Sequence, residues 1–201
     1  MTDETVDELA QFVDRYTMRY DRIYPHPVER VWEALTTAEH LDAWMMPANA
    51  VDARPEGRFT FGFGQDVVSG LHGTIATFEP HAVVDYAFDN GSSMRFELQA
   101  FEGGTRLAFI HSFPIGQHGE PMPGDPGGDL PGGGDTPWRP GFVAGFHQCL
   151  VDLGTHLAGE GPALEDKVAA VDRNQAGDHD PDWLRLTEVY RRHIVDTIPP
   201  R

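Results

Sequence analysis

The spacing of hydrophobic and polar residues changes along the chain, and each spacing predicts a different kind of element. At the N-terminus apolar residues recur every three or four positions, which predicts an amphipathic helix over Thr5–Arg15. A strand is expected over Tyr16–Tyr24 and ends before Pro25. Two short helices should follow, one beginning near Pro27 and one over Ala38–Met45.

From Val51 to Phe113 the spacing changes to every second residue, which is typical of strands with one buried face. Asn90-Gly91 and Gly103-Gly104 supply the tight turns between consecutive strands, so the sheet should be an antiparallel meander. The residues that share the apolar face include Phe59, Phe61, Phe63, Val84, Tyr86, Phe88, Met94, Phe96, Leu98, Leu107, Phe109 and His111.

The segment 114–141 contains nine glycines and seven prolines, so no helix or strand is expected there. We expect a long loop, mobile over Gly116–Thr136 and sensitive to proteases. The longest helix should follow over Phe142–Gly159, with an apolar stripe formed by Phe142, Phe146, Cys149, Leu150, Leu153 and Leu157.

The remaining residues, 160–201, predict a helical extension. A short helix is expected over Pro162–Val171, and a last helix should begin at a cap formed by Asp182. The last helix carries Trp183 and Tyr190 on its apolar side, and it should bury them either on the same domain or on a second copy of the chain. A homodimer through this extension is therefore one expectation.

Strands joined as hairpins, rather than through crossover helices, place the chain in the α+β class. One face of a curved sheet needs an apolar cover, and the long helix is large enough to provide it. We therefore expect one domain over residues 1–159, with the sheet wrapped around that helix, and an extension over 160–201.

The composition narrows the range of functions. Hydrophobic residues make up 40% of the chain, and the formal net charge is −17, which disfavours binding to nucleic acid or to anionic membranes. The chain has a single cysteine, Cys149, so no internal disulfide can form. The first residues lack the pattern of a signal peptide, and no apolar run is long enough to span a membrane, so a cytoplasmic location is expected.

Four local segments resemble the activator of heat-shock-protein-90 ATPase homologue family, which is part of the START-like (SRPBCC) superfamily. They are 22–36, 39–45, the late strands at 104–107 with 111–113, and the start of the long helix at Gly141-Phe142. The resemblance covers about 17–158 and implies the helix-grip fold, in which a curved antiparallel sheet grips a long C-terminal helix. Met45 and Phe142 stand where the family often has tryptophan.

The resemblance implies an apolar cavity between sheet and helix. We expect its volume to be about 300 Å³ or more, which is enough to hold a small ligand. The leading hypothesis is binding of a small hydrophobic molecule such as a lipid, a polyketide or an aromatic metabolite. The alternatives are an enzyme of the cyclase or dehydratase kind, or a co-chaperone-like module that activates the heat-shock-protein-90 ATPase. The expected lining residues are Trp44, Phe61, Phe63, Tyr86, Phe88, Phe96, Phe109, His111, Phe146 and Leu150.

Strong catalytic motifs are absent from the sequence, and no cofactor is expected. There is no phosphate-binding glycine loop and no Gly-x-Ser-x-Gly, and the one lysine, Lys167, lies in the extension. His72, His111 and His147 are the candidate metal ligands on the predicted strands and long helix, but their spacing matches no metal motif, so no metal is expected. His111 alternates in step with Leu107 and Phe109, so it should point to the same apolar face. There it orients a polar group of the ligand, acts as a general base, or is a core histidine bonded to the backbone.

Overall fold

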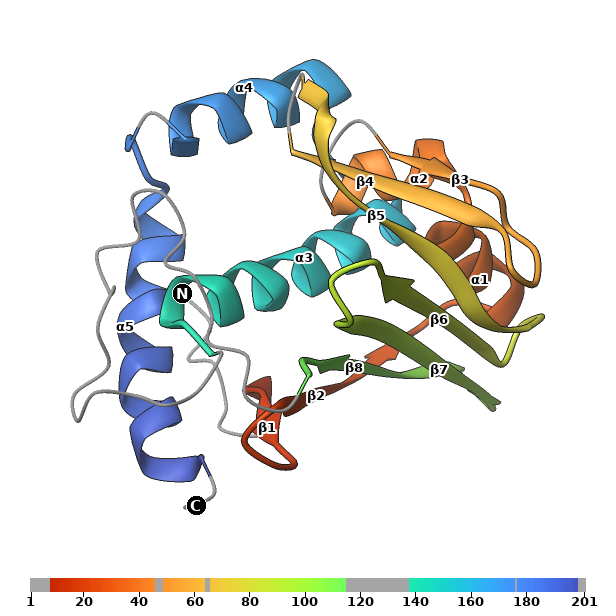
Figure 1. The fold of residues 1–201 in the computed structure, drawn as a ribbon, viewed down its shortest axis with the longest axis horizontal. Coiled ribbons are helices and arrows are strands. Elements are labelled where there is room, and N and C mark those ends of the chain that lie inside the picture. The colour runs from red at the N-terminus through yellow and green to blue at the C-terminus, as the bar shows by residue number, and fades with distance from the viewer. Residues whose placement is uncertain (1–7, 46–48, 64–65, 115–137, 176, 199–201) are drawn as a thin grey trace.

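The computed structural model describes residues 8–45, 49–63, 66–114, 138–175 and 177–198. Eight strands form one antiparallel sheet in the order β1-β2-β8-β7-β6-β5-β4-β3 (Figure 1), which confirms the α+β, helix-grip expectation. The strands are β1 Gln11–Phe12, β2 Thr17–Tyr24, β3 Ala50–Val51, β4 Arg58–Phe63, β5 Asp66–Glu79, β6 Val83–Phe88, β7 Ser93–Phe101 and β8 Gly104–Ser112.

Five helices accompany the sheet within the described ranges: α1 Val28–Thr36, α2 Ala38–Trp44, α3 Pro140–Ala158, α4 Leu164–Gln175 and α5 Pro181–Thr197. None of these helices is both long enough and apolar enough to cross a lipid bilayer. The long helix α3 begins at Pro140, two residues earlier than the sequence pattern suggests, because proline fits the first turn of a helix.

Helix α3 lies against the curved sheet, as Figure 1 shows, and two tyrosines of β2 attach it there. The hydroxyl of Tyr20 donates to the carbonyl of Val143 at 2.7 Å, and the hydroxyl of Tyr24 donates to the carbonyl of Leu150 at 2.8 Å. Both tyrosines are buried, so each hydroxyl needs such a partner. These bonds place the apolar stripe of α3 opposite the inward face of the sheet.

The pair α1–α2 is attached in the same way. The hydroxyl of Tyr86 on β6 donates to the carbonyl of Leu35 at 2.7 Å. The indole Nε1 of Trp44 donates to the carbonyl of Ala34 at 2.8 Å. Trp44 therefore has a fixed position at the junction of α2, α1 and the sheet.

The helix predicted over Thr5–Arg15 is wrong for the residues described. Gln11 and Phe12 instead form β1, which pairs with β2 at the edge of the sheet. Helix α5 also binds this N-terminal segment, through two hydrogen bonds to the backbone of Ala10. The N–H of Ala10 donates to the hydroxyl of Tyr190 at 3.1 Å, and His193 Nε2 donates to the carbonyl of Ala10 at 2.6 Å. Bonds to distant partners thus outweigh the local helical pattern.

The apolar face of α5 packs on α3 of the same chain, so burying that face does not require a second copy. Tyr190 is fully buried, whereas Trp183 is partly buried and donates from Nε1 to the carbonyl of Gly141 at 3.2 Å. The cap of α5 is Asp180 and not Asp182, because Pro181 occupies the first turn. The Asp180 carboxylate accepts from the N–H groups of Asp182 and Trp183.

Most of the glycine- and proline-rich segment, including all of Gly116–Thr136, lies outside the described residues, so its expected mobility remains a prediction. The described part resumes at Trp138, which is fully buried. Trp138 packs against Phe12 and Phe113, with ring centroids 5.8 and 5.2 Å apart. The chain just before α3 is therefore fixed to the sheet.

Candidate functional site

A narrow apolar gap lies between α3 and the sheet. The space between atoms amounts to about 170 Å³, including some solvent at its opening. The gap is nowhere wide enough to admit a water molecule. The residues that line it come from α2 and the residue after it, from β7 and β8, and from α3: Trp44, Met45, Phe96, Phe109, Phe146, Cys149 and Leu150. We call this space the apolar gap.

The apolar gap is smaller than the open cavity of about 300 Å³ or more that the sequence predicts. Aromatic rings fill the space instead. The ring of Phe109 lies 5.0 Å from that of Phe96 and 5.0 Å from that of Phe146, and Trp44 meets Phe96 edge-on at 6.3 Å. Tilted and edge-to-face contacts of this kind are favourable, and they leave little residual volume.

Phe146 differs from the other rings around the gap. Trp44, Phe96 and Phe109 are each 1% exposed, whereas Phe146 is only partly buried. Its neighbours Phe142 and Cys149 on α3 are also partly buried. This stretch of α3 is therefore the least enclosed wall of the gap.

Three predicted site residues, Phe61, Tyr86 and Phe88, are buried but do not line the gap. They form a separate ring cluster with Phe59, in which the Phe59 ring lies 4.7 to 5.1 Å from the other three. Phe63 belongs to β4, and its side chain lies outside the described part of the structure. The sequence identified which residues face inward, but only part of that face lines the gap, and Tyr86 joins the Phe59 group to Phe96, with ring centroids 6.3 Å apart.

His111 lies beside the gap, in a surrounding of aromatic rings. It is 3% exposed, and its Nδ1 lies 2.7 Å from the carbonyl of Ser93. Because a carbonyl only accepts, Nδ1 carries the proton. Burial lowers the pKa of His111 to about 4, so the ring is neutral at pH 7 and Nε2 is an acceptor. This buried Nε2 has no hydrogen-bond partner among the described residues.

Cys149 and Met45 line the gap without having been predicted as site residues. Burial raises the pKa of the Cys149 thiol to about 12, so the thiol is protonated at neutral pH and is a poor nucleophile. The gap thus has an apolar wall on this side as well, with no group suited to proton transfer.

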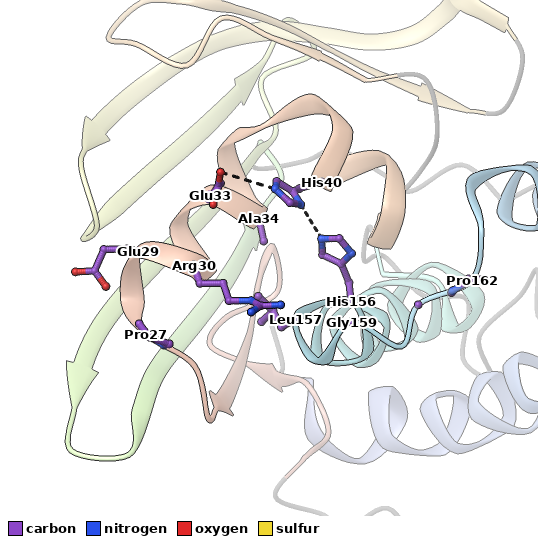
Figure 2. A pocket seen from close by; sticks show the side chains of 11 residues that line it. Pro27, Glu29, Arg30, Glu33, Ala34, His40, His156, Leu157, Gly159 and Pro162 are labelled. Carbon is purple, nitrogen blue, oxygen red and sulfur yellow. Dashed lines mark hydrogen bonds and ion pairs between the residues drawn. The ribbon is translucent and has the colours of Figure 1, made fainter.

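A second hollow, a surface groove of about 730 Å³, lies between α1, α2 and the end of α3 (Figure 2). His40 Nδ1 lies 2.8 Å from His156 Nε2, and His40 Nε2 lies 4.0 Å from the Glu33 carboxylate. Burial and the nearby charges of His40, Arg30 and Lys167 lower the pKa of His156. The groove therefore combines charged and apolar side chains and is open to water.

The three histidines weighed as metal ligands are not brought together. His72 bonds to the Thr60 hydroxyl on the surface, His111 to Ser93, and His147 to the Tyr190 hydroxyl. In the part of the chain that the structure describes, no group of three or more histidine, cysteine or carboxylate side chains is placed to hold a metal ion.

The surroundings of His111 include residues that the sequence analysis did not assign to the site. Phe142 lies four residues before Phe146 on the predicted stripe, so its presence could have been inferred from helical spacing. Trp138 follows a segment with no periodic pattern, and no local signal places it there. His40 and His156 of the groove are 116 positions apart, so no local sequence pattern predicts that they are neighbours.

Comparison with known proteins gives one family. The family described as activator of Hsp90 ATPase homolog 1-like protein matches residues 25–154, within the predicted range of resemblance. No curated protein matches the chain.

Several solved structures share the fold. CalU16 from Micromonospora echinospora is 16% identical, with a TM-score of 0.56, over 92% of this chain and 89% of that one. EF2215 from Enterococcus faecalis, described as a conserved protein of unknown function, is 13% identical, with a TM-score of 0.59, over 94% and 91%. MLL2253 from Mesorhizobium loti is 21% identical, with a TM-score of 0.53, over 71% and 96%. At these identities the likeness concerns the fold alone.

Proposed function

The chain belongs to the family of activator of Hsp90 ATPase homolog 1-like proteins, and we propose that it binds a small apolar molecule between α3 and the sheet. The observation that carries this proposal is the apolar gap, because it lies where α2, α3, β7 and β8 meet and only apolar residues line it.

The gap must widen to accept a ligand, and Phe146 is the residue placed to allow it. Phe146 is the incompletely buried member of the ring set, so its displacement towards solvent exposes less new apolar surface than moving Trp44 or Phe96 would. A flat ring in its place would make the same contacts with Phe109. This geometry favours small aromatic or alicyclic ligands over long chains.

The lining also favours binding over catalysis. A cyclase or dehydratase needs both acid and base groups directed at its substrate. The residues that line the gap supply neither, and the ring neighbours of the imidazole beside it, His111, include no acid. A co-chaperone role would use exposed apolar surface instead, and the large exposed apolar residues of the described part include Ile23 on β2, Phe101 on β7 and Val195 on α5.

Naphthalene is a suitable probe, and Phe146 provides the test. We expect naphthalene to raise the melting temperature of the protein, since a ligand that binds only the native state stabilises it. Phe146→Ala should strengthen the effect by enlarging the gap, and Phe146→Trp should weaken it. Phe101→Ala is the matched control, because Phe101 is a 38% exposed ring at the far end of β7.

Equal binding by wild type, Phe146→Ala and Phe146→Trp would refute the proposed position of the ligand. No binding by any of them would refute small-molecule binding in the gap, and a protein partner would then be the better explanation. Native mass spectrometry of freshly purified protein provides a second measurement, since a retained molecule would be seen directly as added mass.

A further inference from the structure

His111 combines two properties that rarely occur together in a packed core. It is almost completely buried, and one of its two ring nitrogens, Nε2, has no hydrogen-bond partner among the described residues. A buried acceptor without a partner costs free energy, so most such groups in native proteins are paired with protein or water. The unpaired Nε2 therefore calls for an explanation.

The hydrogen bond of Nδ1 determines whether Nε2 carries a proton. Nδ1 donates its proton to the Ser93 carbonyl at 2.7 Å, and the ring is neutral, so Nε2 presents a lone pair and no hydrogen. It can accept a hydrogen bond but cannot donate one. Its missing partner must be an O–H or N–H group.

The surroundings of His111 indicate what would carry that donor. Five aromatic rings have centroids within 6.4 Å of the imidazole centroid: Phe109, Phe113, Trp138, Phe142 and Phe146. Such a surrounding favours another aromatic ring over a flexible chain or an ion. A carboxylate, which only accepts, would face the lone pair of Nε2 with no donor from this residue.

Phe146 connects this histidine to the apolar gap. The Phe146 ring lies 5.0 Å from Phe109, which lines the gap, and 5.2 Å from His111, so it contacts both. A ligand that displaced Phe146 would contact the apolar wall on one side and His111 on the other. The apolar gap and the unpaired acceptor therefore share Phe146 as a neighbour.

We propose that the ligand is a neutral aromatic alcohol whose hydroxyl donates to Nε2 of His111 while its ring occupies the position of Phe146. This inference rests on the proposed function and specifies its ligand class. His111 acts here as the specificity-determining residue of a binding site, and no covalent step is involved.

Naphthalene and three of its derivatives separate the two proposals at pH 7. Naphthalene tests whether the gap binds an apolar ring at all. 2-Naphthol adds the donor, 2-methoxynaphthalene keeps the oxygen but removes the donor, and 2-naphthoate is an anion. We expect 2-naphthol to bind about tenfold or more tightly than 2-methoxynaphthalene, as measured by calorimetry, and 2-naphthoate to bind more weakly than either.

His111→Phe removes the acceptor and keeps a planar ring, and His72→Phe is the matched control on the surface of β5. The preference for 2-naphthol should fall to about one or below in His111→Phe and stay unchanged in His72→Phe. Should His111→Phe fail to fold, NMR of wild type replaces it. The ¹⁵N resonance of His111 Nε2 should then shift with 2-naphthol and not with 2-methoxynaphthalene.

The outcomes are distinguishable. Binding of naphthalene with no preference for 2-naphthol, or with 2-naphthoate bound most tightly, would overturn the role of His111 and leave the apolar site intact. A preference that survives in His111→Phe would overturn it equally. Absence of binding by all four compounds would overturn the proposed function and this inference together.

Discussion

The hydroxyl of Tyr190 on α5 lies 2.8 Å from Nδ1 of His147 on α3, and both side chains are at most 2% exposed. The same hydroxyl accepts from the N–H of Ala10. One phenol therefore joins the N-terminal segment, the central helix and the C-terminal helix. Burial, together with the charges of Arg22 and Arg185, lowers the pKa of His147 to about 4, so the contact forms with a neutral imidazole.

Stability should consequently fall in mild acid. His147 and His111 both have a pKa of about 4 when folded, against about 6.5 when unfolded. Below pH 6.5 the unfolded chain binds more protons, so the stabilisation is fully present above pH 6.5 and is lost as the pH falls towards 4. Between pH 6.5 and 5 we expect a loss of about 1.5 kcal/mol per histidine in the free energy of unfolding, measured with urea.

A variant separates the two contributions to this loss. In His147→Gln about half of the pH dependence over this range should disappear, because His111 still titrates. A free energy of unfolding that is the same at pH 7 and pH 5 would show that neither histidine is held neutral.

The pKa of His156 in the groove should depend on His40. His156 has a lowered pKa, and His40, 2.8 Å away, contributes to that shift. In His40→Gln the titration midpoint of His156, followed by ¹H–¹³C NMR, should therefore move up towards 6.5. His26→Gln serves as the control and should leave it in place. An unchanged midpoint in His40→Gln would mean that the two rings do not interact in solution.

Cys149 should react slowly with alkylating agents. A thiol with a pKa of about 12 is almost entirely protonated at pH 8, and the thiolate is the reactive form. We expect iodoacetamide to modify the native protein at least tenfold more slowly than the urea-unfolded chain. Because Cys149 lines the apolar gap, saturating naphthalene should slow the reaction further. Fast modification that naphthalene does not affect would place the thiol outside the proposed site.

Lys167, the single lysine of the chain, should matter for the attachment of α4. It is 8% exposed, and its Nζ lies 3.0 Å from the Asp152 carboxylate on α3. Lys167→Ala leaves this carboxylate without its cation and removes packing, so we expect a loss of about 1–2 kcal/mol in urea unfolding. Lys167→Met keeps the apolar stem and should cost less. Equal losses in the two variants would assign the effect to charge alone.

Local patterns were sufficient for most of the fold. Alternation from Phe59 to His111 predicted an antiparallel meander, and the stripe from Phe142 to Leu157 predicted α3, because one buried face imposes a period on any strand or helix. The same alternation placed Phe109 and His111 on the inward face. The one predicted helix that the structure replaces, over Thr5–Arg15, is the segment whose backbone partners, Tyr190 and His193, lie about 180 positions away.

Only the tertiary structure decided how the inward side chains fill their space. Periodicity identifies which residues face inward, but it carries no information about ring orientation or about which rings become neighbours. The sequence therefore predicted an aromatic lining and an open cavity, whereas tilted rings reduce that cavity to a narrow gap. The unpaired nitrogen of His111 and the pairing of His40 with His156 also depend on contacts between distant segments, since a hydrogen bond is set by three-dimensional position and not by spacing along the chain.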